Sequence, residues 1–362
     1  MNNNFDPNSQ NGYGAHFYSN AWSAPPSLEK DIRHSFSKIG LSLFAYIAVS
    51  NVVAIAAQFL IILIVTLSTG SPEGALGVFD NPFVSAGLGI LPMYIVGLPI
   101  LYLIIRKMEK RSRKPLKMGA REFFGFFFVS VLLMYLGSYI GEMLNAMFSG
   151  ILGHQIQNST SNVIESWPIW LVFILVVILG PLVEEFIFRK LLIDRMSVYG
   201  DKIAIVISAV AFGIHHGNFF QFFYAAFLGL VLGYMYVKTN RLIYPFLMHA
   251  ALNFIGSIIP MSLYGFFDEL TALEESLLLG AEIDMGRYYL CLSVSALYSL
   301  VMFGMMITGA VILFKNFRKI KIDPYCRIDI PHGRVFSLTV GNVGMILFLI
   351  AGFAVFGLSL MA

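Results

Sequence analysis

The sequence has 362 residues, of which 57% are hydrophobic and only 12% are charged. Soluble globular proteins carry about 25% charged residues, so this composition excludes a soluble enzyme, a nucleic-acid-binding protein and a disordered scaffold. A mean hydropathy of +0.76 and long apolar runs predict an all-α, polytopic membrane helix bundle. The net charge of +3 and the two cysteines indicate neither a particular partner nor a disulfide framework.

The first 37 residues are polar and rich in Asn, Ser, Gly and Pro, which predicts a disordered cytosolic tail without a cleavable signal peptide. Crossing the ~30 Å hydrocarbon layer takes about 20 apolar residues in a helix. Eight or nine transmembrane helices are expected, and fewer if the short fifth run forms a re-entrant hairpin with the sixth. The nine candidate runs are 39–68, 82–105, 123–148, 167–187, 203–217, 219–237, 242–260, 288–314 and 336–361.

The distribution of Lys and Arg predicts the orientation, because cytoplasmic loops hold these residues in excess. With a cytosolic N-terminus and nine spans, Arg287 is the one basic residue of 24 that falls on the outer side. The region between the seventh and eighth runs is acidic instead. We therefore expect a multi-pass protein of the cell membrane, and of a bacterial plasma membrane in particular, with its N-terminus inside.

Ionisable residues inside the spans are the candidates for function, because each costs on the order of 2.5–3.5 kcal/mol near the bilayer centre. The fourth run ends in Gly180-Pro181-Leu-Val-Glu184-Glu185-Phe-Ile-Phe-Arg189. Glu185 and Arg189 share a helix face and can pair, whereas Glu184 points about 100° away. Pro181 predicts a helix irregularity just before them. The alternative is that both carboxylates lie in water at the cytosolic end of the span.

Two further runs carry polar residues at helical spacing. His216 follows Phe212 by four residues in the fifth run, and Asn253 follows His249 by four in the seventh. An isolated intramembrane His is more often a packing residue than a ligand. However, the chain from Glu184 to the turn near Gly200 is as long as the chain from that turn to His216. The polar groups are therefore expected to converge in the inner half of the membrane.

Such a set of side chains suits hydrolysis of an acyl bond. Glu184, His216 and His249 can bind a divalent metal such as Zn²⁺ and leave a position for water. The same residues can instead work without metal, with a carboxylate as general base and His and Asn as oxyanion donors. A proton relay in a transporter would use similar groups, so that alternative also stays open.

The three motifs resemble those of the CPBP family of intramembrane proteases, which includes CAAX prenyl-protein endopeptidases and proteins of bacteriocin processing and self-immunity. The likeness covers about residues 165–258 and contains all three motifs without a substitution. It implies that Glu184 activates water and that His216 positions or polarises that water. It implies that Glu185 and Arg189, with Phe212, organise the helices. His249 and Asn253 would then stabilise the oxyanion or complete a metal site. His215, one residue from the motif position, is interpreted as a packing residue or as a residue that supports the site from outside the reacting groups.

The resemblance predicts an intramembrane endopeptidase acting on a membrane-embedded, membrane-associated or lipidated protein or peptide. The alternatives are a non-catalytic immunity or scaffold protein and, less favoured, a proton-coupled transporter. The lipid bilayer is an expected partner and nucleic acid is not; the oligomeric state is left open. The expected regions are the tail (1–37), N-terminal transmembrane helices (38–160), a catalytic core (161–260), an acidic extracytosolic loop (261–287) and C-terminal transmembrane helices (288–362).

Overall fold

The protein forms a bundle of helices. The computed structural model describes residues 26–322 and 326–361, apart from 159–161, 163–164, 329 and 331, and within these residues there are helices and no strands. Seven of the described helices are long and apolar enough to cross a membrane, and Val343–Ser359 is a shorter apolar helix. The prediction of an all-α, polytopic membrane protein is therefore confirmed.

Several of the spans are built from more than one helical segment, because widened π-type turns interrupt them. Helix α1 packs along α16, α5 packs on both α11 and α14, and α10 packs on α11. The segments that build the transmembrane part are α1 (Pro26–Thr69), α3 (Pro82–Leu91), η1 (Pro92–Gly97), α4 (Leu98–Ile105), α5 (Ala120–Leu152), α7 (Ile169–Val172), η2 (Phe173–Leu179), α8 (Gly180–Glu185), η3 (Phe186–Ile193), α9 (Asp194–Met196), η4 (Ser197–Tyr199), α10 (Asp201–His215), α11 (Phe219–Thr239), α12 (Ile243–Asn253), η5 (Phe254–Ile258), α13 (Ile259–Leu278), α14 (Met285–Asn316) and α16 (Val343–Ser359). The short segments α2 (Gly74–Phe79), η6 (Phe317–Lys319), η7 (His332–Arg334) and α15 (Val335–Thr339) lie between them.

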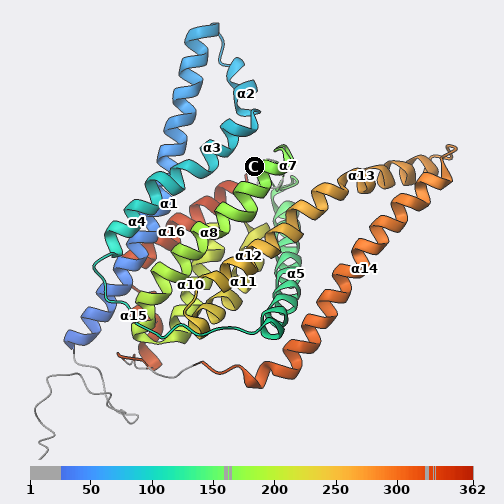
Figure 1. Cartoon of the computed structure of the whole chain (residues 1–362). Coiled ribbons are helices and arrows are strands. Elements are labelled where there is room, and N and C mark those ends of the chain that lie inside the picture. The colour runs from blue at the N-terminus through green and yellow to red at the C-terminus, as the bar shows by residue number, and fades with distance from the viewer. Residues whose placement is uncertain are drawn as a thin grey trace, which may run out of the picture.

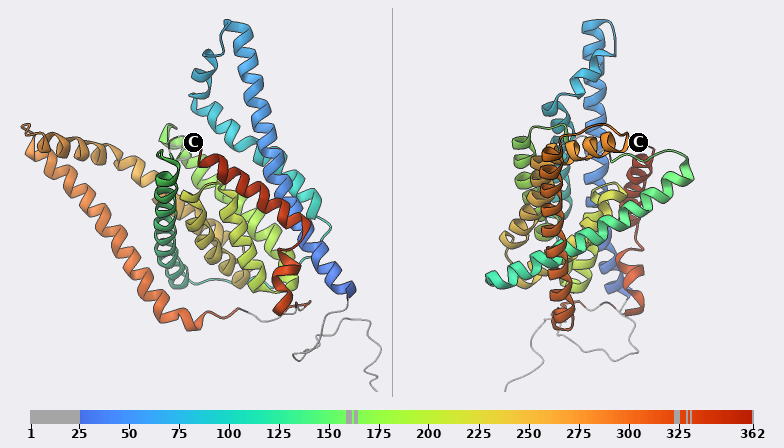
Figure 2. Two further views of the ribbon diagram at one scale, coloured as in Figure 1. Left: turned by 180° about the vertical axis from the view of Figure 1, so that it is seen from behind. Right: turned by 90° about the vertical axis from the view of Figure 1, so that its right-hand side faces the viewer.

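The helices that carry the candidate motifs lie in the centre of the bundle. Figure 1 shows α8, α10, α11 and α12 side by side, with α1 and α16 on one flank and α5 and α14 on the other. The hairpins α1–α3 and α13–α14 extend away from this centre, and α5 crosses it obliquely in the side view (Figure 2). Helix α1 begins at one end of the bundle and α16 finishes at the other (Figure 1), as an odd number of crossings requires.

The expected tail is shorter than its predicted boundary at residue 37. Helix α1 begins at Pro26, and residues 1–25 lie outside the described part of the chain. Ile32, Phe36 and Ile39 recur at helical spacing and are completely buried in the core. Burying this apolar stripe stabilises the helix across residues that are polar on average.

The helices of two predicted spans are shorter than a full membrane crossing requires. Helix α10 has 15 residues, which at 1.5 Å per residue gives about 22 Å, less than the thickness of the hydrocarbon layer. It forms the expected hairpin with α11 through Gly217, whose φ of +69° favours glycine. The last predicted run, 336–361, is divided into α15 and α16 because the Asn342 side chain accepts a hydrogen bond from the Met345 N–H at 3.0 Å and starts a new helix.

The region 261–287, which was expected to be an acidic loop, is mostly helical. The helix α12 continues through η5 into α13, which ends at Leu278. Arg287, at the start of α14, donates to both carboxylate oxygens of Glu269 at 2.5 and 2.6 Å and so joins the two helices. The acidic residues therefore lie largely on a helix, and the connection between α13 and α14 is short.

Close contacts between helix backbones depend on glycine at the crossing of α1 and α16. A Cβ atom at Gly344 would lie 1.8 Å from the backbone oxygen of Ser37, and one at Gly40 would lie 2.2 Å from the backbone nitrogen of Met345. Membrane helices associate through such small-residue contacts because lipid offers no hydrophobic driving force between them. The crossing thus holds the last helix against the first.

We predict that Gly344→Ala lowers the midpoint of thermal unfolding of the detergent-solubilised protein, because overpacking costs about 1–3 kcal/mol. Gly357→Ala on the same helix is the matched control, since nothing lies within 4 Å of its added methyl group. The control is expected to leave the midpoint unchanged. Equal midpoints for the two variants would contradict the assigned crossing of α1 and α16.

Candidate active site

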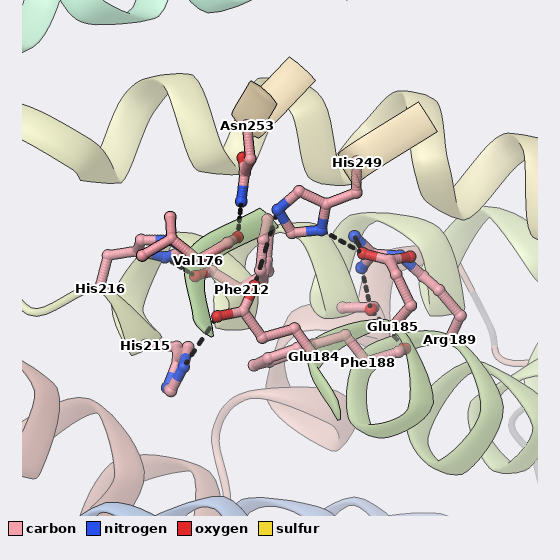
Figure 3. A network of polar contacts seen from close by, with 11 residues as sticks. Val176, Glu184, Glu185, Phe188, Arg189, Phe212, His215, His216, His249 and Asn253 are labelled. Carbon is pink, nitrogen blue, oxygen red and sulfur yellow. Dashed lines mark hydrogen bonds and ion pairs between the residues drawn. The ribbon is translucent and has the colours of Figure 1, made fainter. Parts of the chain in front are cut away.

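The helix that carries the two carboxylates has an irregular backbone just before them, as Pro181 predicts. The N–H of Gly180 donates to the carbonyl of Leu175, five residues earlier, in a π-type turn. At the same spacing the carbonyl of Val176 would face Pro181, which has no N–H to donate. The side-chain amide of Asn253 on α12 instead donates to the Val176 oxygen at 2.8 Å (Figure 3). One N–H of the Asn253 amide is therefore used to join α12 to η2, and the second remains for another acceptor.

Glu185 and Arg189 form a completely buried ion pair on this helix. Nε of Arg189 donates to Oε2 of Glu185 at 2.9 Å, and Nη2 donates to Oε1 at 3.2 Å. Both side chains are 0% exposed. The i, i+4 pairing expected from the sequence is present, and it is bidentate, which is the strongest geometry between a guanidinium and a carboxylate.

Helix α10 supports the other parts of the Arg189 guanidinium. Nη1 of Arg189 donates to the Ser208 hydroxyl at 3.2 Å, and that hydroxyl donates to the Phe188 carbonyl at 2.7 Å. The Phe212 ring lies 5.0 Å from the guanidinium carbon, at a distance suited to a cation–π contact. Phe212, predicted as a supporting residue, therefore packs against the arginine that orders the site.

His249 on α12 lies between the two carboxylates. Its Nδ1 is 3.0 Å from Oε1 of Glu185, and its Nε2 is 3.7 Å from Oε2 of Glu184. An ionised Glu185 can only accept, so Nδ1 of His249 carries the proton of this hydrogen bond. In a neutral ring Nε2 then presents a lone pair toward Glu184. Glu185 thus fixes the tautomer and the ring orientation of His249 (Figure 3).

Glu184 is the more accessible of the two carboxylates. Its side chain is 17% exposed, whereas that of Glu185 is completely buried. Oε1 of Glu184 lies 3.8 Å from Nε2 of His215 on α10, and Oε2 faces His249. Glu184 is therefore flanked by two imidazoles, and neither is within hydrogen-bond distance. A water molecule that lies about 2.8 Å from the carboxylate and about 2.8 Å from one of these rings would bridge the two groups.

His215 packs against the rings of Tyr46 and Phe188 and also faces Glu184. His215 is the histidine of α10 that comes within 4 Å of a Glu184 oxygen, whereas His216 turns toward its own helix and its Nδ1 lies 2.9 Å from the Phe212 carbonyl. The rings of His215 and His216 are 5.6 Å apart. His216 keeps helical dihedrals at the end of α10, so it lies on the face of Phe212 as the i, i+4 spacing predicts, and its ring centroid is 4.9 Å from that of Phe212.

No sequence pattern indicated Tyr46, which reaches this region from α1. Its ring centroid lies 5.5 Å from that of His215, and the residue is 1% exposed. The hydroxyl of Tyr46 and Nδ1 of His215 are both buried without a hydrogen-bond partner in the described part of the chain. A single tyrosine in a long apolar run carries no pattern, so only the packing of α1 against the core reveals it.

Glu184, His216 and His249 are the predicted metal ligands. Among the described residues no group of three or more His, Cys, Asp and Glu side chains is arranged to hold a metal ion. Nδ1 of His249 is committed to Glu185, and His216 is turned to the Phe212 carbonyl. Both contacts are made at Nδ1 and leave Nε2 of each ring free, so a metal role for Glu184, His216 and His249 stays a prediction.

Comparison with known proteins gives one family match. Residues 166–255 match the family described as type II CAAX prenyl endopeptidase Rce1-like. This range contains Glu184, Glu185, Arg189, His249 and Asn253 together with α10.

Two curated bacterial proteins are similar to the chain. "Putative membrane peptidase YdiL" of Bacillus subtilis (strain 168) is 26% identical over 183 residues, which cover 48% of this chain and 72% of that protein. "Membrane-embedded CAAX protease MroQ" of Staphylococcus aureus (strain USA300) is 32% identical over 112 residues, which cover 28% of this chain and 44% of that protein. No solved structure matches the chain significantly. Residues 166–255 of this multi-pass membrane protein are therefore similar to a family of CAAX prenyl endopeptidases, and the two bacterial relatives are described as a membrane peptidase and a CAAX protease, in agreement with the resemblance of its motifs.

Proposed function

We propose that the protein is an intramembrane endopeptidase of the cell membrane, which hydrolyses a peptide bond of a membrane-associated or lipidated protein or peptide. The match to a CAAX protease family supports endopeptidase activity. The observation that carries the mechanism is the contrast between two adjacent carboxylates. Glu185 is completely buried and paired with Arg189, whereas Glu184 is partly exposed beside two imidazoles.

Glu184 is the general base in the proposed first step. A water molecule bound between Glu184 and His249 gives a proton to the Glu184 carboxylate while its oxygen attacks the scissile carbonyl carbon. The carbonyl π electrons move to the oxygen, which becomes the oxyanion. General-base catalysis of this kind contributes on the order of 10²–10⁴-fold to a rate. Glu185 cannot take this role, because both of its oxygens accept hydrogen bonds from Arg189.

Breakdown of the tetrahedral intermediate returns the proton. The C–N bond breaks, the oxyanion reforms a carbonyl, and the protonated Glu184 gives its proton to the leaving amine. The products are a new carboxyl group and a new amine, and Glu184 is again ionised. In this scheme the second N–H of the Asn253 amide, which the Val176 carbonyl does not use, is the donor available to the oxyanion.

His249 orients the water and does not act alone. Arg189 holds Glu185, Glu185 accepts from Nδ1 of His249, and Nε2 of His249 then faces Glu184. A chain of this kind fixes the imidazole in one tautomer, so its unprotonated nitrogen is presented to the reacting water. His215 bounds the opposite side of Glu184, and we assign to it the second contact with the water or with the substrate.

We predict that Glu184→Gln lowers the rate of cleavage of a membrane-anchored reporter peptide by about 10²-fold or more, because the amide cannot accept the proton from water. The assay uses purified protein in liposomes, with fragments identified by mass spectrometry. Glu142→Gln is the matched control, since Glu142 is an exposed acid on α5, outside the site. Its rate should equal that of the wild type.

Cleavage by Glu184→Gln at the wild-type rate would contradict the assignment of the base. A chelator added to the same assay is expected to leave the wild-type rate unchanged, because no step of the proposed mechanism uses a metal. Loss of activity with the chelator, and its restoration by Zn²⁺ alone, would show that the mechanism is wrong.

A second prediction separates positioning from stability. Arg189→Lys keeps the charge but loses the bidentate contact with Glu185, so His249 is held less firmly. Arg195→Lys is the matched control: Arg195 is also buried on this helix, and its Nε donates to the Ile105 carbonyl at 2.8 Å, away from the carboxylates. Both variants should lower the unfolding midpoint.

Only Arg189→Lys is expected to lower kcat of the folded protein, by about 10- to 100-fold, because small misplacements of catalytic groups have large effects on rate. KM should change little in either variant. Equal kcat values for the two folded variants would restrict Arg189 to a purely structural role.

A further inference from the structure

A basic cavity lies at the end of the bundle opposite the α13–α14 tip. It has a volume of about 620 Å³, within the usual range of ligand sites, and its walls come from the connection 106–119, the last turn of α11 and the segment after α14. Among the described residues, one acidic residue, Asp201, lines it. Six basic residues also line it: Arg111, Arg113, Lys114, Lys238, Lys319 and Lys321.

The cavity is part of the folded structure and not a loose surface feature. The Leu116 N–H donates to the Thr239 carbonyl at 2.8 Å, and the Asn240 side chain donates to the Arg113 carbonyl at 2.6 Å. These bonds hold the connection 106–119 against the end of α11. On the opposite wall the Tyr234 hydroxyl donates to the Lys321 carbonyl at 3.3 Å. Three segments that are far apart in the sequence are therefore brought around one space.

The charge in the cavity is only partly compensated. Asp201 pairs with both Arg111, at 2.9 Å, and Arg113, and Lys238 pairs with Glu122, which is outside the lining. Nε and Nη1 of Arg113 are nevertheless buried without a hydrogen-bond partner in the described part of the chain. A buried donor without an acceptor is costly, and guanidinium groups bind phosphate oxygens in a bidentate manner. The cavity is therefore suited to a phosphate-bearing anion.

The place of the cavity indicates the source of that anion. Candidate spans α5, α11 and α14 begin or end at Ala120, Thr239 and Asn316, within a few residues of its walls. The cavity is thus at the surface of the bilayer, where phospholipid headgroups lie. Basic pockets between transmembrane helices at this level bind anionic headgroups.

We propose that this cavity binds the phosphate-bearing headgroup of an anionic glycerophospholipid, such as phosphatidylglycerol, from the adjoining leaflet. Arg113 receives the phosphate, and Lys114, Lys319 and Lys321 surround it. Asp201 begins α10, the helix that ends at His215, and the Arg111 N–H donates to the Asp194 carbonyl at 2.8 Å. The headgroup therefore stabilises the base of the helices that carry the candidate active site.

The test titrates detergent-solubilised protein with short-chain phosphatidylglycerol, short-chain phosphatidylcholine or inorganic phosphate, and follows the midpoint of thermal unfolding. The cavity variant combines Lys114→Gln, Lys319→Gln and Lys321→Gln, which are exposed side chains whose loss should not prevent folding. The control combines Lys107→Gln, Lys110→Gln and Lys315→Gln, which are exposed and outside the cavity lining but remove the same charge.

Phosphatidylglycerol should raise the midpoint of the wild type and the control, and phosphatidylcholine should not. In the cavity variant its half-saturating concentration should rise on the order of 100-fold, because each basic residue near a membrane surface contributes about fivefold. A response to phosphatidylglycerol without a response to inorganic phosphate supports a lipid ligand, and a response to both supports recognition of the phosphate itself. Equal titrations of the cavity variant and the control, or equal effects of the two lipids, would overturn the proposal.

Discussion

The buried ion pair between Glu185 and Arg189 is the constraint on which the centre of the structure depends. Two charges that are 0% exposed carry a desolvation penalty of several kcal/mol each, which is offset only by good geometry and further hydrogen bonds. Each of the three nitrogens of Arg189 donates to Glu185 or to the Ser208 hydroxyl, and the Phe212 ring lies against the guanidinium. The pair therefore joins η3 to α10, and through His249 it joins both to α12.

The same ion pair makes the neighbouring carboxylates of Glu184 and Glu185 differ in their availability to water. Because Glu185 is engaged on both oxygens, Glu184 is the carboxylate left for a substrate water. The short length of α10 brings its end, and hence His215, to the depth of Glu184. The other end of α10 begins at Asp201, in the wall of the basic cavity. One short helix thus connects the membrane surface with the proposed site of hydrolysis.

Contacts between side chains on a regular helix could be predicted from their spacing in the sequence, whereas contacts that depend on irregular backbone could not. The i, i+4 rule predicted the contact between Glu185 and Arg189, which the structure contains. The same rule placed His216 on the face of Phe212, and the two rings are in contact, whereas the assignment of His216 to Glu184 came from the family resemblance and it is His215 that lies within 4 Å of a Glu184 oxygen. The contact of Asn253 with the Val176 carbonyl depends on a π-type turn and a missing proline N–H. Local sequence patterns do not predict the position of Tyr46 either, because it follows from packing between segments that are distant in the sequence.

The central claim is that Glu185 and His249 act as one unit in presenting water to Glu184. A double-mutant cycle tests it most directly, with single-turnover cleavage rates measured for Glu185→Gln, His249→Asn and the double variant, each normalised to its folded fraction. The account predicts that the double variant is no more than about threefold slower than the slower single variant, because groups that act as a unit lose their joint effect only once. Rate losses that multiply in the double variant would show that the two residues act independently, and would contradict the account.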